Sequence, residues 1–210
     1  MPPLPPILVL VGGPLGGKST SEKAIELEFG RQGKVHFVDE AATVLLSDAL
    51  FPRPDPLAGE PKRHWLFHFQ IALAGAMTMV EHAARKFARL RGEIDLIVCD
   101  RGLPDIWAYL DAKDHRAIEA ILGCTLERAL GRYTAVLFLE TLAASKPELY
   151  EKLAANNSVR NETVAEACAI DALTRDIWSR HPRFHAIDGV RSVEEQSRET
   201  IRFCGELLAH

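Results

Sequence analysis

Short apolar segments alternate with segments of helical periodicity along almost the whole chain. Several of the apolar segments show no alternation with polar residues, which is typical of parallel strands buried on both faces. This order predicts right-handed β-α-β units, and therefore an α/β fold of three layers with helices on both faces of a five-stranded, mainly parallel sheet. The predicted strands are Ile7–Val11, Val35–Val38, Ile94–Cys99, Ala135–Leu139 and Phe184–Ile187.

The longest helical pattern covers residues 61–90. Pro61 near its beginning and Gly92 just past its end are residue types typical of helix boundaries. The proline-rich segment 51–59 before it predicts an irregular loop, because proline removes a backbone donor and restricts the preceding residue. This loop is either a flap on the substrate side or a plain connector. The repeating apolar positions, which form one continuous stripe, are Leu66, Phe69, Leu73, Met77, Val80, Ala84 and Phe87.

A glycine-rich segment follows the first predicted strand directly. Residues 12–19 match the pattern G-x-x-x-x-G-K-[S/T] at every fixed position, between a predicted strand and a predicted helix. The glycines allow successive backbone N–H groups to face one centre, and the helix N-terminus adds its dipole, so the segment predicts a P-loop for nucleotide phosphates. We expect Lys18 to reach the β- and γ-phosphates and the Ser19 hydroxyl to bind Mg²⁺. The residues expected to bind ATP are Gly12, Gly13, Pro14, Leu15, Gly16, Gly17, Lys18, Ser19 and Thr20.

Charged residues follow the second and third predicted strands. Asp100 and Arg101 come after the third strand, at the sheet edge where open α/β sheets bind ligands. We expect Asp100 to hold Mg²⁺, directly or through water, and Arg101 to meet an anionic or hydroxylated substrate; an ion pair at the strand end is the alternative. Asp39 and Glu40 close the second strand, where a carboxylate can accept a proton from an attacking hydroxyl. We favour Glu40 as this base and Asp39 as a substrate contact, the alternative being acids that stabilise the N-terminus of the next helix.

Composition narrows the class of partner. The 210 residues suffice for one domain over residues 1–210, and 25 basic against 29 acidic residues give a net charge of −4, which disfavours nucleic acid as a partner. No apolar run approaches a membrane span, and the N-terminal residues lack the positive segment of a signal peptide. The four cysteines lie far apart without a C-x-x-C pair, which argues against a zinc site. We therefore expect a cytoplasmic protein that acts on a small molecule, with neither nucleic acid nor membrane as partner.

These segments, taken in order, resemble the P-loop "AAA domain" proteins that are described as predicted ATPases or kinases. They are also similar to the ribosylnicotinamide kinase domain of the bifunctional NAD-biosynthetic protein, and more loosely to thymidylate and deoxynucleoside kinases. Only the P-loop is a specific motif when taken alone. The other segments support the resemblance because they occur in the same order, and together the segments span nearly the whole chain. The matching segments are 12–20, Asp39-Glu40-Ala41-Ala42, 100–105 with Tyr109, Arg132-Tyr133 and Arg160-Asn161-Glu162.

The resemblance implies several further roles. In such kinases the carboxylate after the second strand is the usual base, which favours Glu40, and the segment 100–105 implies a substrate contact for Asp105. A glutamine on the long helix often contacts a nucleobase, which implies this role for Gln70; a half-buried structural glutamine is the alternative. Arg160 falls where these folds carry a mobile lid, here at about residues 143–162, whose arginine approaches the transferred phosphate; the alternative is a solvated surface arginine.

Two positions depart from the usual pattern of the family. Thr43 stands where Glu-Ala-Ala-Arg has its arginine, so one candidate substrate contact is missing. Leu15 and Gly16 replace Gly-Ala in the loop that usually reads Gly-Gly-Pro-Gly-Ala-Gly, and a leucine is tolerated there if its φ is negative. Both differences bear on the substrate more than on the nucleotide.

Together, the motifs and the resemblance predict a Mg²⁺–ATP-dependent kinase of a small hydroxylated metabolite, such as a nucleoside, riboside or nucleotide. The residues expected to carry catalysis are Lys18, Glu40, Asp100, Arg101 and Arg160. The alternative is a regulatory ATPase or switch that passes phosphate to water and acts through a protein partner. A switch specific for GTP would carry an Asn-Lys-x-Asp motif, which the sequence lacks.

Overall fold

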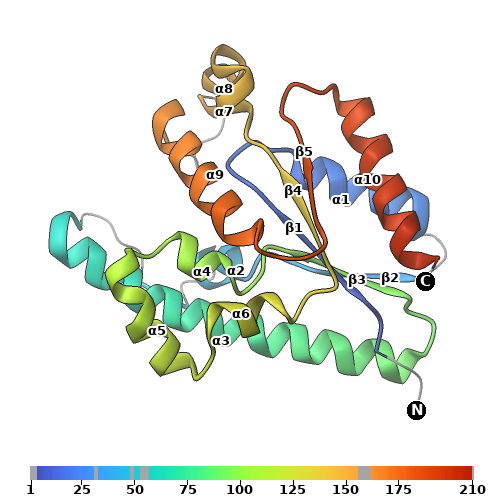
Figure 1. The fold of residues 1–210 in the computed structure, drawn as a ribbon, viewed down its shortest axis with the longest axis horizontal. Helices are drawn as coiled ribbons and strands as arrows, with labels where there is room; N and C mark the ends of the chain where they lie inside the picture. Colours follow the sequence, from blue (N-terminus) through green and yellow to red (C-terminus); the bar gives the residue numbers. More distant parts are fainter. Residues whose placement is uncertain (1–3, 31–32, 48–49, 53–56, 156–161, 210) are drawn as a thin grey trace.

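The computed structural model describes residues 4–30, 33–47, 50–52, 57–155 and 162–209, and these form one α/β unit around a five-stranded sheet (Figure 1). The strand order is β2-β3-β1-β4-β5, and all four neighbouring pairs are parallel. The predicted α/β fold with a parallel five-stranded sheet is therefore confirmed. The strands are β1 (Ile7–Val11), β2 (Val35–Val38), β3 (Leu96–Asp100), β4 (Ala135–Leu139) and β5 (Phe184–Ile187).

The third strand is shifted from its predicted position by one or two residues. Its pairing with β2 begins at Leu96, opposite Val35, so Ile94 and Asp95 precede the ladder. At the other end Asp100 pairs with Leu10 of β1, which makes it the last residue of the strand. The Asp100 carboxylate therefore comes from the sheet itself, and Arg101 is the first residue beyond it.

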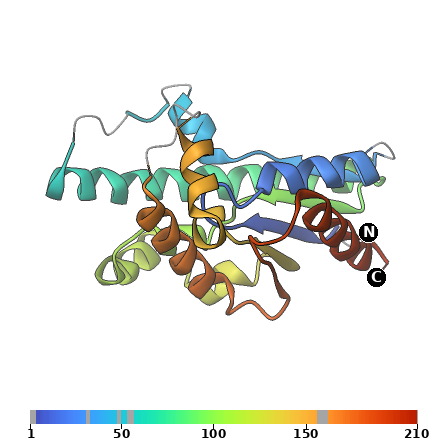
Figure 2. The same cartoon turned by 90° about the horizontal axis from the view of Figure 1, so that it is seen from above.

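Helices cover both faces of the sheet and give the three predicted layers (Figures 1 and 2). On one face, α1 and α10 pack against alternate strand residues such as Leu8 and Leu137. On the other face, α3, the short helices α4–α6 and the end of α9 pack against residues such as Val9 and Phe138. The helices are α1 (Lys18–Phe29), α2 (Ala41–Ser47), α3 (Gly59–Arg91), α4 (Asp105–Ala108), the 3₁₀ helix η2 (Ala112–Asp114), α5 (His115–Leu122), α6 (Leu126–Leu130), α7 (Leu142–Ser145), α8 (Pro147–Ala154), α9 (Val164–Trp178) and α10 (Val193–Leu208).

Helix α3 spans the molecule, and its 33 residues extend the predicted helix by two residues at the start and one at the end (Figures 1 and 2). Its buried face is rotated slightly from the predicted stripe. Val80 and Phe87 are 37% and 44% exposed, whereas Glu81 is only 2% exposed. Glu81 is tolerated in the interior because Arg132 and the Tyr133 hydroxyl donate hydrogen bonds to its carboxylate. Val80 and Phe87 instead line an apolar groove of about 520 Å³ beside α2 and β2.

No helix within the described part of the chain is both long enough and apolar enough to cross a membrane.

Candidate active site

The P-loop lies between β1 and α1, against the end of β4. A Cβ on Gly12 would lie 2.0 Å from the Leu139 carbonyl oxygen, and its φ of +143° also favours glycine. The loop ends at Gly17, the N-cap of α1, which has no side chain to cap the helix. The N–H groups of the first turn, at residues 18–20, lack intrahelical acceptors, and they and the helix dipole form a site suited to phosphate.

Leu15 adopts a positive φ of 56°, which corrects the expectation that a leucine here would need a negative one. Its side chain packs against a small apolar cluster built from α7, α8 and α9, which includes Tyr150 and Ala167. This packing offsets the strain of the left-handed conformation. The glycine that the loop requires is the next residue, Gly16, because a Cβ there would lie 2.3 Å from the Leu139 carbonyl oxygen.

The first half of the P-loop is tied to the start of α7 and to α9. Asp171 of α9 accepts a hydrogen bond from the Gly13 N–H at 2.8 Å, and the Thr141 hydroxyl donates to the Pro14 carbonyl oxygen. The Gly13 N–H thus has an acceptor within the protein, so Gly13 and Pro14 shape the loop. The backbone donors at the start of α1 are available for a phosphate.

Lys18 is half-buried among charged groups from three strand ends. Burial is the main cause that lowers the pKa of its amine, and Arg101 lowers it further, while Asp100, Glu40 and Asp105 act to raise it. β3 lies between β1 and β2 in the sheet, so the P-loop, Asp100 and Glu40 come together at one edge. Ser19 is exposed at the same helix end. The structure therefore brings together four of the residues expected to carry catalysis: Lys18, Glu40, Asp100 and Arg101.

Asp100 has a buried carboxylate oxygen, Oδ1, without a hydrogen-bond partner in the described part of the chain. Burial raises the pKa of this carboxyl group, and Lys18 opposes the rise. Among the described residues, no group of three or more His, Cys, Asp or Glu side chains could hold a metal ion. An unpartnered oxygen beside the P-loop fits Mg²⁺, which is usually held by one or two carboxylates together with substrate phosphates and water.

Arg101 links the two carboxylates that follow β2 and β3. Its Nε donates a hydrogen bond to Glu40 Oε1 at 2.8 Å, and its Nη1 lies 3.9 Å from Asp105 Oδ1. The residue has a positive φ of 69°, a strained conformation for a side chain of this size, and its guanidinium packs over the Tyr109 ring. Arg101 was expected either to contact the substrate or to form an ion pair at the strand end, and the ion pair is present. The guanidinium lies beside the P-loop, with Nη1 3.5 Å from the Gly12 carbonyl oxygen.

Glu40 is the carboxylate that faces this cluster, whereas Asp39 is exposed. The Thr43 hydroxyl donates to Glu40 Oε2 at 2.7 Å, so the residue that replaces the family's arginine holds the carboxylate. Burial acts to raise the pKa of Glu40, but Arg101, Thr43 and Lys18 together hold it below its ordinary value. Glu40 is therefore ionised at neutral pH, as a base must be.

Glu22 belongs to the same charged cluster, and our sequence reasoning missed it. It lies four residues after Lys18 on α1, which places both side chains on one face of the helix. Burial and the nearby carboxylates of Asp100, Asp39 and Glu40 raise the pKa of Glu22 to about 7, against an opposing effect of Lys18. The spacing of four from the P-loop lysine was the signal available in the sequence.

Gln70 is more deeply buried than expected, at 3% exposed, and its Oε1 has no hydrogen-bond partner among the described residues. Two turns further along the same face, Met77 lines a small cleft together with Asp39, Asp100 and Arg101. Its neighbour in the sequence, Phe69, is also buried, and Trp65 stacks on Phe69 with centroids 5.0 Å apart. A buried acceptor oxygen without a donor is unfavourable, which makes this atom a candidate contact for a ligand.

Asp105 does not have the position expected of a substrate contact. Its carboxylate is 2% exposed and accepts hydrogen bonds from the Gly102 N–H and the Trp178 indole N–H, each at 3.0 Å. Asp105 therefore holds the turn after β3 and the guanidinium of Arg101. Arg160 lies in residues 156–161, outside the described part of the chain, so its role and that of a lid at 143–162 stay predictions.

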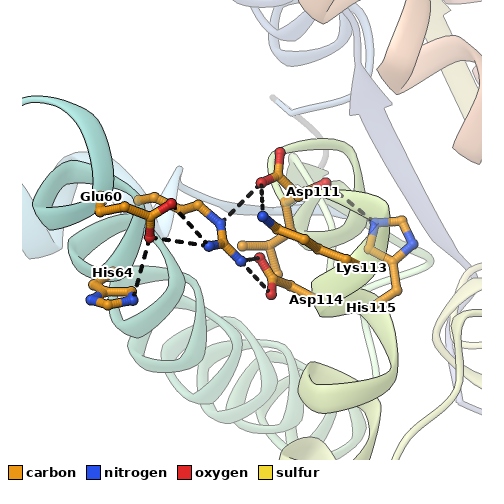
Figure 3. Close-up of polar contacts among 8 residues, drawn as sticks. Glu60, His64, Asp111, Lys113, Asp114 and His115 are labelled. Atoms are coloured by element: carbon orange, nitrogen blue, oxygen red, sulfur yellow. Dashed lines mark hydrogen bonds and ion pairs between the residues drawn. The ribbon is translucent and has the colours of Figure 1, made fainter.

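Ion pairs fix the N-terminal half of α3, which carries Gln70, to the segment after α4 (Figure 3). Both Asp114 oxygens accept hydrogen bonds from Arg63 Nη2 at 2.8 Å, and Arg63 Nε lies 3.0 Å from Asp111. Glu60 pairs with the same guanidinium at 3.2 Å. The Arg63 guanidinium thus pairs with three carboxylates, one on α3 and two after α4, which makes this contact a network and not a single surface ion pair.

Comparisons with known proteins bear on the fold and the family. The deoxyadenosine kinase of M. mycoides, solved with its products dCMP and a flexible dCDP bound, has a similar structure, with a TM-score of 0.59 and 12% identity over 95% of this chain and 99% of that chain. At this identity the likeness shows the fold alone. No curated protein sequence matches the chain. The sequence profile of the AAA domain family matches residues 7–196, which is nearly the whole chain, and the protein therefore belongs to the AAA domain family.

Proposed function

We propose that the protein is a Mg²⁺–ATP-dependent kinase that transfers the γ-phosphate to a hydroxyl group of a nucleoside, riboside or nucleotide. The observation that carries the proposal is the meeting of Lys18, Glu40, Asp100 and Arg101 at one edge of the sheet. The similar fold of a deoxyadenosine kinase supports the same class of reaction.

The residues at the start of α1 bind the phosphates in this proposal. The first-turn N–H groups and the Lys18 amine face the β- and γ-phosphates, and Ser19 and Asp100 hold Mg²⁺ through the hydroxyl and the unpartnered Oδ1. Bound Mg²⁺ supplies positive charge that neutralises the phosphate oxygens. Arg101, fixed beside the loop by Glu40 and Asp105, stabilises negative charge that develops during transfer. Arg160 has the same role in the proposal, from the predicted lid.

Glu40 accepts the proton of the acceptor hydroxyl. Each of its oxygens already accepts one hydrogen bond, from Arg101 and from Thr43. A carboxylate has about four lone-pair sites, so both oxygens keep capacity for a further donor. As the hydroxyl oxygen attacks the γ-phosphorus, its proton passes to Glu40, and the bond between the γ-phosphorus and the bridging oxygen breaks to release ADP.

The acceptor is an organic molecule with a planar polar group. The free Oε1 of Gln70 needs a donor that the described protein residues do not supply. An exocyclic amine or amide, as in adenosine, cytidine or nicotinamide riboside, satisfies this oxygen. A regulatory ATPase that uses water would leave Gln70 unpaired.

The test measures Mg²⁺–ATP consumption across a panel of nucleosides, ribosides and nucleoside monophosphates, with the phosphorylated product identified by mass spectrometry. We expect a large rise in turnover with one class of acceptor, and loss of this rise in Lys18→Ala and Glu40→Gln. Lys23→Ala, an exposed lysine of the same helix, is the control. ATP binding without acceptor-dependent product would reject the kinase and favour the ATPase or switch.

A further inference from the structure

Helix α9 presents one buried face to both halves of the candidate active site. Asp171, Thr174 and Trp178 are buried on this face at spacings of three and four residues, while Leu173 and Asp176 are exposed. The helix packs against α4, α7 and β4, which lie beside the P-loop and the turn after β3 (Figure 1). A single rigid element therefore contacts the two segments that carry the phosphate site and Arg101.

The first contact is a carboxylate clamp on the P-loop. Asp171 is 6% exposed, and its Oδ1 accepts hydrogen bonds from the Gly13 N–H at 2.8 Å and the Thr141 N–H at 3.0 Å. Thr141 in turn donates its hydroxyl proton to the Pro14 carbonyl oxygen. A Cβ on Gly13 would lie 2.6 Å from Asp171 Oδ1, so the approach of loop and carboxylate requires glycine. Burial of a carboxylate is unfavourable unless such bonds compensate it, and both donors belong to backbone that no sheet ladder satisfies.

The second contact reaches Arg101 through Asp105. The indole N–H of Trp178 donates to Asp105 Oδ1 at 3.0 Å, and this oxygen lies 3.9 Å from Arg101 Nη1. Asp105 Oδ2 holds the Gly102 N–H at 3.0 Å. Arg101 has a strained backbone with φ of 69°, and such a conformation persists only where neighbouring contacts hold it. Trp178 is fully buried, so it fixes the Asp105 carboxylate in one orientation.

We propose that Asp171, with Thr141, is a positioning residue for the P-loop and that Trp178, through Asp105, is a positioning residue for Arg101. The inference rests on the proposed kinase function and extends it to residues that touch neither nucleotide nor acceptor. The two residues affect different steps: Asp171 affects nucleotide binding, and Trp178 affects phosphoryl transfer.

The loop half is tested by the dissociation constant for Mg²⁺–ATP, measured by calorimetry. We expect Asp171→Ala to weaken binding about tenfold or more, since two backbone donors lose their acceptor, and Asp171→Asn to stay within about threefold because its amide oxygen accepts the same bonds. Asp176→Ala, an exposed aspartate of the same helix that pairs with Arg180, is the matched control and should bind like the wild type. Thr141→Val, which loses the bond to Pro14 and the cap on the Ala143 N–H but keeps its own N–H, should weaken binding about threefold.

The arginine half is tested by kcat with the acceptor that gives the highest rate. We expect Trp178→Phe to lower kcat about tenfold while the dissociation constant for Mg²⁺–ATP changes by less than about threefold. The matched control is Trp107→Phe, because Trp107 is also buried but its indole N–H has no hydrogen-bond partner among the described residues. This variant reports the effect of a smaller ring alone.

These outcomes separate the inference from the function on which it rests. A wild-type protein that binds no Mg²⁺–ATP and phosphorylates no acceptor contradicts the proposed function. An active wild type with a folded Asp171→Ala that binds Mg²⁺–ATP like Asp176→Ala overturns the loop half. If Asp171→Ala does not fold, an unchanged dissociation constant in Thr141→Val overturns it instead. Equal kcat in Trp178→Phe and Trp107→Phe overturns the arginine half. It is also overturned if Trp178→Phe weakens Mg²⁺–ATP binding by the same factor as it lowers kcat.

Discussion

The phosphate side of the site is held mainly through backbone groups, whereas the acceptor side depends on side chains. In the P-loop, Asp171 binds the Gly13 N–H, Gln196 of α10 donates to the Gly16 and Gly17 carbonyl oxygens, and glycines contact the end of β4. On the acceptor side, Glu40 and Arg101 hold each other through side-chain atoms.

This difference fits what each side binds in the proposed function. Phosphate oxygens are identical in every nucleotide, so a rigid set of N–H donors and a helix end recognise them without regard to the rest of the ligand. The molecule that would receive the phosphate differs from one substrate to another, so in the proposed function its own polar groups are matched by side chains such as Gln70. In the proposed function, the unpartnered oxygens of Gln70 and Asp100 are the points that a bound ligand would complete.

The largest effect is expected from the phosphate side, in Lys18→Ala. Removal of the amine should lower the rate of phosphoryl transfer by roughly 10³-fold, the size of losing one charged donor to a transition state. Burial lowers the pKa of Lys18, which means that its charge is unfavourable in the folded protein, so the melting temperature should stay the same or rise. Steady-state kinetics and thermal melting check both parts, with Lys23→Ala as control; a rate equal to that of the control would contradict the role.

A smaller loss of rate is expected from the acceptor side, in Glu40→Gln. General base catalysis contributes about 10²–10⁴-fold, and we expect the lower end because Arg101 and Asp100 remain. Binding of Mg²⁺–ATP should change little, since the P-loop contacts are untouched. The comparison of kcat with the nucleotide dissociation constant, beside Glu28→Gln as an exposed control, distinguishes a base from a phosphate ligand. A loss in binding as large as the loss in rate would place Glu40 on the phosphate side.

Much of the fold and of the phosphate side was predictable because both depend on local sequence. Four strands have their predicted bounds, since runs such as Ile7–Val11 have one type of burial throughout. The P-loop was recognisable from its spacing and context. Asp171 was not, because it lies 158 residues from its partner Gly13 and nothing local to α9 indicates the contact. Leu15 was misjudged for the same reason, since helices α7–α9 hold its side chain.

A third prediction concerns Gln70 and sharpens the acceptor side. Its buried Oε1 is unpaired among the described residues, so Gln70→Leu should raise or preserve the melting temperature, because it replaces an unsatisfied polar atom with an apolar group of similar volume. The same change should raise KM for the acceptor about tenfold, the effect of one lost hydrogen bond of average strength, and leave KM for ATP unchanged. Thr78→Leu, at an exposed position of α3, controls for helix propensity. A lower melting temperature with unchanged acceptor KM would identify Gln70 as structural.

The smallest effect is expected from a substitution of Glu22, which lies between the phosphate side and the acceptor side, and it concerns the melting temperature. Burial and nearby carboxylates raise its pKa from 4.5 to about 7, so the folded protein binds a proton here more tightly than the unfolded chain. Stability contributed by this group is therefore present below pH 4.5 and is lost as the pH rises through 7. Glu22→Gln should melt like the wild type at pH 5 and a few degrees higher at pH 8, when the wild-type carboxylate is charged beside Asp100. Thermal melting at both pH values, with exposed Glu26→Gln as control, measures the difference in melting temperature between variant and wild type. The same increase in melting temperature at pH 5 and at pH 8 would show that the charge of Glu22 does not destabilise the protein.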